Sequence, residues 1–85
     1  MNYYDIIQCM HNMGANQKKY EQATYTSIIN AIISFYMADE FFTLDDCIRV
    51  FQCFLTTGAI IWYDNKYNER KSRIITSRIY SWIKN

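Results

Sequence analysis

The sequence contains no proline and only two glycines in 85 residues, so no part of it has the composition of a linker or a disordered tail. Its charge-free runs are too short for a transmembrane helix, which needs about 20 apolar residues. The N-terminal stretch MNYYDIIQCM lacks the basic region and apolar core of a secretory signal. From these absences we expect one cytoplasmic domain over residues 1–85 that does not enter a membrane.

Metal-binding motifs are also missing. The three cysteines, Cys9, Cys47 and Cys53, form no CxxC pair, and His11 is the only histidine. A structural zinc site needs about four ligands, so we expect no metal and interpret the cysteines as small hydrophobic residues of the interior. On one helix, Cys47 and Cys53 would point about 120° apart, which excludes a disulfide between them.

Motifs for catalysis are equally scarce. No Ser/His/Asp or Cys/His arrangement is recognisable, and the two glycines stand too far apart for a phosphate-binding loop. Asp45 and Asp46 belong to an acidic stretch, residues 39–46, that resembles a divalent-metal site. However, both follow Thr43 at the predicted start of a helix, where carboxylates favour the helix dipole. We therefore expect neither enzymatic activity nor a cofactor.

Apolar residues at helical spacing predict three helices in the first two thirds of the chain. The first covers residues 3–13, and Gly14 follows as its C-terminal stop. The strongest part of the second covers residues 25–39, whose apolar arc is so wide that we expect a central, buried helix. Thr43 is a suitable N-cap for the third helix, which Gly58 ends.

The last third of the chain is less uniform. Residues 59–63, AIIWY, could form a short strand or prolong the third helix, and a lone strand would need a second copy of the chain as its partner. Residues 68–83 carry Ile and Trp at intervals of four and predict an amphipathic helix. The predicted fold class is all-α: a compact small bundle of about four helices, with one short strand near residues 59–63 as an open alternative.

The charges are unevenly divided. Residues 1–64 hold three cationic and seven anionic side chains, a net charge of −4, whereas residues 65–85 hold six cationic and one anionic, a net charge of +5. Three interpretations of the basic segment stay open. It could bind phosphates, it could dock on an acidic partner such as the 39–46 region of a neighbouring copy, or it could be a solvated face.

The candidate binding residues belong to this basic segment. Its cationic side chains would contact phosphate or carboxylate groups, and Tyr67, with Tyr63 just before the segment, would stack on nucleobases. The candidates for binding a protein partner or nucleic acid are Lys66, Tyr67, Arg70, Lys71, Arg73 and Arg78.

Aromatic residues make up 18% of the chain, which is rich for its size, so either the core is unusually aromatic or some aromatic side chains face a partner. Five of them fall at positions that we expect to be exposed: Tyr3, Tyr4, Tyr20, Phe41 and Phe42. Exposed aromatic side chains supply large contact areas in protein interfaces. We therefore predict a protein partner, in a homodimer or a tight complex with another protein.

These observations favour a small, non-enzymatic interaction module that acts by steric binding to a protein partner. The amino-acid usage, rich in Ile, Asn, Lys, Tyr and Phe, is typical of AT-rich genomes such as those of many low-GC bacteria and their phages. One concrete version is therefore a phage or mobile-element inhibitor of a host defence system, similar in kind to an anti-CRISPR. The alternative is a small nucleic-acid-binding regulator that uses the basic C-terminal helix.

Overall fold

Two of the three long helices begin with a capping box, which fixes their first residues. The computed structural model describes residues 2–60, 76–77 and 79–81, and its helices are α1 (Tyr3–Gln17), α2 (Gln22–Ala38) and α3 (Leu44–Thr57). At α1, the Asn2 side chain accepts a hydrogen bond from the Asp5 backbone, and the Asp5 carboxylate accepts one from Asn2 N–H. Reciprocal bonds of this kind satisfy backbone donors that a helix start leaves unpaired.

The helix α3 starts in the predicted way. Thr43 is its N-cap: the Thr43 N–H donates to Asp46 Oδ2 over 2.9 Å, and the Asp46 N–H donates to Thr43 Oγ1 over 3.2 Å. The Asp46 side chain is buried, yet its other oxygen lies 3.5 Å from Nη1 of Arg49. Gly58 ends α3 at a φ of 75°, a left-handed conformation that glycine adopts without steric cost.

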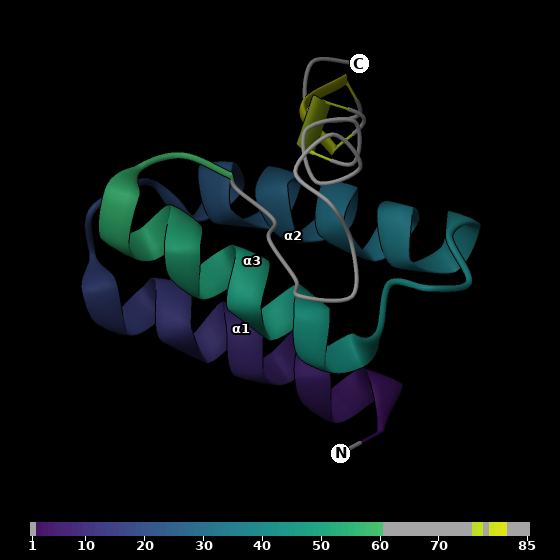
Figure 1. Ribbon diagram of the computed structural model, residues 1–85. Coiled ribbons are helices and arrows are strands. Elements are labelled where there is room, and N and C mark those ends of the chain that lie inside the picture. The colour runs from purple at the N-terminus through teal and green to yellow at the C-terminus, as the bar shows by residue number, and fades with distance from the viewer. Residues whose placement is uncertain (1, 61–75, 78, 82–85) are drawn as a thin grey trace.

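The three helices alternate in direction, as Figure 1 shows. The helices α1 and α3 run side by side in the same direction, and α2 runs opposite to both. Every pair of the three is in contact. The N-terminus of α1, the C-terminus of α2 and the α2–α3 connection therefore lie at one end of the bundle. The all-α prediction is confirmed, and the described part of the chain contains no strand.

The core is built around α2, as its wide apolar arc predicts. Seven residues of α2 are buried, more than in either neighbouring helix, whereas Ser27, Asn30 and Ser34 on its other side are exposed. Aromatic rings also contact one another in this core. The ring of Phe35 on α2 meets the ring of Phe42, in the α2–α3 connection, edge to face with 4.8 Å between the ring centroids. The largest fully buried side chains are Phe35, Phe42, Phe51, Ile6, Met10, Ile29, Ile32, Ile60 and Ile79.

The prediction that Gly14 stops the first helix is wrong. The helix α1 continues to Gln17, and Lys18 ends it in the left-handed conformation at a φ of 54°. Gly14 lies inside the helix because the ring of Tyr25 packs directly over it, and a Cβ at position 14 would stand 2.8 Å from Tyr25 Cγ. The glycine thus provides space for an aromatic ring of α2.

Phe42 is buried, although we expected its side chain to be exposed. Its side chain is 2% exposed, because the turn before α3 directs it into the core against Phe35. Tyr3 is half-buried for a similar reason, since it packs on the core and lies near the ring of Tyr36. The other three aromatic residues that we expected at the surface, Tyr4, Tyr20 and Phe41, are exposed.

The described residues of the last segment, 76–77 and 79–81, are helical, and two of them, Ile79 and Tyr80, pack on the core. Ile79 is fully buried, and the Tyr80 hydroxyl accepts a hydrogen bond of 2.6 Å from the backbone N–H of Ile60. Ala59 and Ile60 form no strand, while residues 61–63 of that predicted alternative lie outside the described part of the chain. So does most of the helix predicted over residues 68–83.

Candidate functional site

The binding residues predicted from the sequence lie outside the described residues. This applies to Lys66, Tyr67, Arg70, Lys71, Arg73 and Arg78. The structure therefore brings none of these six into a site, and the geometry described below concerns the three-helix body.

One end of this body carries a group of large side chains, which we call the aromatic end: Tyr3, Tyr4, Tyr36, Met37 and Phe41. They come from the first turn of α1, the last turn of α2 and the turn after it, which meet at this end in Figure 1. Tyr3 lies at its base, with ring centroids 5.4 Å from Tyr4 and 6.2 Å from Tyr36. The half-buried Tyr3 thereby connects the two helices.

Three side chains of the aromatic end are strongly exposed. Tyr4 is 78% exposed, Met37 is 73% exposed and Phe41 is 63% exposed. Single exposed apolar residues are common on protein surfaces, but several on adjoining turns are typical of a surface that contacts another molecule. The exposure of Met37 was not predicted, since the sequence pattern placed it on the apolar arc of α2.

Carboxylates surround these side chains. Asp5, Glu40 and Asp45 are exposed near the same helix ends, and Asp39 is half-buried and accepts a hydrogen bond of 2.9 Å from the Phe41 N–H. Two of the three cationic residues within 2–60, Lys18 and Lys19, follow the C-terminus of α1 at the opposite end of the bundle. The aromatic end is therefore apolar at its centre and acidic around it.

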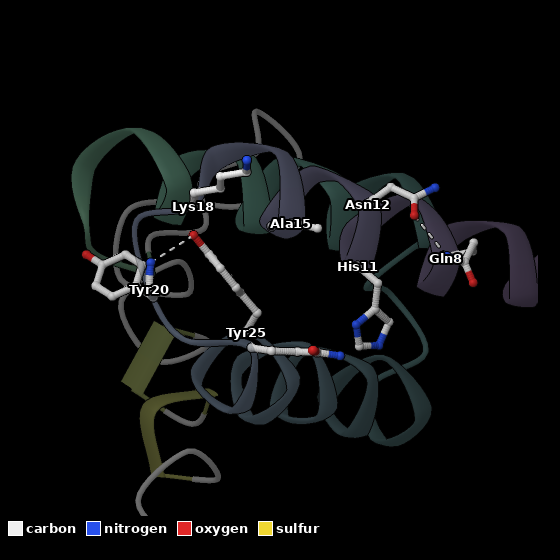
Figure 2. A pocket seen from close by; sticks show the side chains of 9 residues that line it. Gln8, His11, Asn12, Ala15, Lys18, Tyr20 and Tyr25 are labelled. Atoms are coloured by element: carbon white, nitrogen blue, oxygen red, sulfur yellow. Dashed lines mark hydrogen bonds between the residues drawn. The ribbon is translucent and has the colours of Figure 1, made fainter.

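A second feature is a groove of about 560 Å³ between α1 and the beginning of α2. Figure 2 shows Lys18 and Tyr20 at one end of it and Gln8, His11 and Asn12 at the other. We call it the α1–α2 groove; the described residues that line it are Gln8, His11, Asn12, Gly14, Ala15, Lys18, Tyr20, Gln22 and Tyr25.

Tyr25 gives this groove a fixed wall. Its hydroxyl accepts hydrogen bonds from the backbone N–H groups of Lys19 and Tyr20, over 3.1 and 3.2 Å, and thus holds the α1–α2 connection. The Tyr20 ring stacks on Phe54 of α3 with centroids 5.3 Å apart. These contacts within the chain fix the position of the groove wall.

Cys47, a potential nucleophile, is buried inside the bundle. Burial, with a smaller contribution from the neighbouring Asp46, raises the pKa of the Cys47 thiol to about 12, so this thiol stays protonated and inert at neutral pH. Cys9, Cys47 and Cys53 are all free. Among the described residues, no group of three or more His, Cys, Asp and Glu side chains is arranged to hold a metal ion.

Comparisons with protein-family models, with curated proteins and with solved structures gave no significant match. Within the described residues, none of the helices has the length and hydrophobicity needed to cross a membrane.

The groove residues were not predicted as a site. On a helix, residues 8, 11, 12, 15 and 18 share one face, and this face of α1 is polar. That pattern is visible in the sequence, but it is also typical of an ordinary solvent-exposed face. Only the position of α2, with Tyr25 packed on Gly14, converts it into one side of a groove.

Proposed function

We propose that this protein is a non-enzymatic interaction module that acts by steric binding to a protein surface through its aromatic end. The observation that carries the proposal is the exposure of Tyr4, Met37 and Phe41 on adjoining turns. Aromatic and methionine side chains are enriched at the centres of protein interfaces, where a polar rim surrounds them. The carboxylates around the aromatic end would form such a rim.

The charges of the chain favour a second copy of the same chain as the partner of the aromatic end. The acidic rim selects a basic surface, because complementary charges speed association and exclude wrong partners. Residues 65–85 of a second copy would supply that chemistry, since they carry six cationic side chains and one anionic side chain. We therefore propose a cytoplasmic homodimer, and steric inhibition of a host defence system as one function within this class.

Replacing Met37 and Phe41 together by Ser should convert the dimer into a monomer. Both side chains are largely exposed, so the helices should remain folded while the apolar centre of the interface is lost. Sedimentation velocity over a range of protein concentrations measures the change. Raising the salt concentration should also weaken the wild-type dimer, because the Debye length falls from about 10 Å at 0.1 M to about 3 Å at 1 M.

The matched control replaces Gln17 and Gln52, which are exposed elsewhere on the bundle, by Ser. This control should sediment like the wild type. A wild-type protein that stays monomeric at high micromolar concentration, or a Met37/Phe41 variant that still dimerises with unchanged affinity, would refute the proposed dimer.

A second candidate function is nucleic-acid binding, favoured by the net charge of +5 in residues 65–85. Replacing Arg70, Lys71 and Arg73 together by Ala should abolish binding to labelled DNA or RNA. In the wild type, the logarithm of the binding constant should fall linearly with the logarithm of salt concentration, because bound phosphates release counterions. Gel-shift titrations at several salt concentrations test this prediction. Absence of binding at low salt would refute nucleic-acid binding as the function.

A further inference from the structure

The acidic stretch, residues 39–46, contains four carboxylates, and the structure divides them into two pairs. Asp39 accepts a hydrogen bond from a backbone N–H of the turn after α2, and Asp46 accepts one at the start of α3. Glu40 and Asp45 are exposed, and neither side chain makes a hydrogen bond or an ion pair with another described residue. The local structure therefore uses one pair of carboxylates and leaves the other pair available.

Both available carboxylates line one groove. It has a volume of about 480 Å³ and lies at the aromatic end, between the last turn of α2 and the first turn of α3. Its apolar wall consists of the half-buried Tyr36 and Leu44 and the buried Phe42. We call it the α2–α3 groove; the described residues that line it are Tyr36, Glu40, Phe42, Thr43, Leu44 and Asp45. The groove thus combines an apolar wall with two carboxylates, and none of these lining residues is cationic.

An arginine side chain has the groups that match such a groove. Its aliphatic stem packs on apolar surface while the charged group stays at the polar edge. The guanidinium is attracted to the rings of tyrosines, and it donates paired, charge-assisted hydrogen bonds to carboxylates. A lysine offers only a compact ammonium group without this planar fork. The α2–α3 groove is therefore better suited to an arginine than to a lysine.

The distribution of arginine in the chain indicates where this side chain comes from. Within residues 2–60 the only arginine is Arg49, whose Nη1 lies 3.5 Å from the Asp46 carboxylate. The net charge of −4 in residues 1–64 is complementary to the net charge of +5 in residues 65–85, and such complementarity selects partners. The other three arginines all belong to this basic segment: Arg70, Arg73 and Arg78.

We infer that the α2–α3 groove receives an arginine side chain from residues 70–78 of a second copy of this chain. The inference rests on the proposed homodimer and adds the polar contact that holds it: Tyr36, Glu40 and Asp45 form the receiving side. A two-fold symmetric dimer contains this contact twice. Each substitution in the groove therefore removes two contacts from the dimer.

Removing the two charges of the groove tests the inference in the full-length protein. Replacing Glu40 by Gln and Asp45 by Asn should raise the dissociation constant of the dimer about tenfold or more, since charge-assisted hydrogen bonds are lost at both contacts. Sedimentation equilibrium measures this constant. The matched control replaces Asp5 by Asn and Glu21 by Gln, which removes two exposed carboxylates outside the groove. This control should dimerise with an affinity close to that of the wild type.

Exchanging the charges identifies the occupant. One variant reverses the groove by Glu40→Lys and Asp45→Lys, and the other reverses the basic segment by Arg70→Glu and Arg73→Glu. Each should be monomeric alone, because like charges then face each other. An equimolar mixture should form dimers, because every groove again meets a segment of opposite charge. Circular dichroism verifies that both variants are folded, and the neutral groove variant keeps the test valid if one is not.

The results that would overturn the inference differ from those that would overturn the homodimer. A wild-type dimer that is unaffected by the neutral groove substitutions, or equally weakened by the control, would exclude the groove and leave the aromatic end as the interface. A mixture that forms no dimer, while one chain with all four reversals recovers wild-type thermal stability, would assign the groove to the chain's own basic segment. A monomeric wild type would refute both proposals and leave the groove to a different protein.

Discussion

Replacing Phe51 by Asp should leave the protein unfolded at 25 °C. Phe51 is fully buried on α3, with its ring 6.3 Å from that of Tyr25 and 6.2 Å from that of Phe54, measured between centroids. Loss of a buried Phe side chain costs about 3–5 kcal/mol, and an unpaired buried carboxylate adds several more. A domain of this length has a total stability of about 4–13 kcal/mol, so the substitution removes most or all of it.

Far-ultraviolet circular dichroism and urea titration measure this effect. The control is Gln52→Asp, which introduces the same residue one position further along α3 at an exposed site. This variant should keep its helical signal and lose well under 2 kcal/mol of unfolding free energy. A Phe51→Asp protein with a cooperative transition near that of the wild type would show that the α3 stripe is not the core.

Replacing Gly14 by Leu should destabilise the protein by about 3 kcal/mol. Even the first added carbon would lie 2.8 Å from Tyr25 Cγ and 3.0 Å from Cδ1, inside contact distance. The Tyr25 ring cannot easily move away, because its hydroxyl is held by two backbone N–H groups and the ring makes a T-shaped contact with Phe51. Thermal unfolding of the purified variant, followed by circular dichroism, measures the loss.

The smaller change Gly14→Ala separates packing from helix propensity. Propensity alone predicts a gain of about 1 kcal/mol, because Ala is favoured over Gly inside a helix. The contact with Tyr25 predicts a net loss, since overpacking costs about 1–3 kcal/mol. The reference variant Ala15→Gly, at the exposed neighbouring position, reports the propensity effect by itself. A gain in stability for Gly14→Ala would contradict the packing described for this residue.

The helices could be predicted from the sequence because their signals are local. Thr43 followed by Asp46 specifies the start of α3, and Gly58 specifies its end; the structure has both. The apolar arc of residues 25–39 correctly predicted that α2 is the most buried helix. Such patterns depend on residues three or four positions apart, which a single sequence displays directly.

The features that could not be predicted depend on residues far apart in the chain. Glycine often ends a helix, so the sequence alone predicts that Gly14 ends the first one. Only the contact with Tyr25, eleven residues later, explains why Gly14 lies inside α1. The burial of Phe42 could not be predicted for the same reason, because it depends on the contact with Phe35 in the preceding helix. The groove and the aromatic end likewise require the packing of α1 on α2, which no local pattern specifies.

The start of α2 has a consequence for attempts to reduce the protein to a peptide. Its N-cap, Glu21, makes no side-chain capping bond, and no acidic residue lies in its first turn, unlike α1 and α3. Short helices without such support are marginal in water, so α2 depends on its neighbours to remain helical. Because the aromatic end combines the first turn of α1 with the last turn of α2, a synthetic fragment with only one of these helices would not reproduce its shape, and an inhibitor or affinity reagent derived from it would need the whole folded domain.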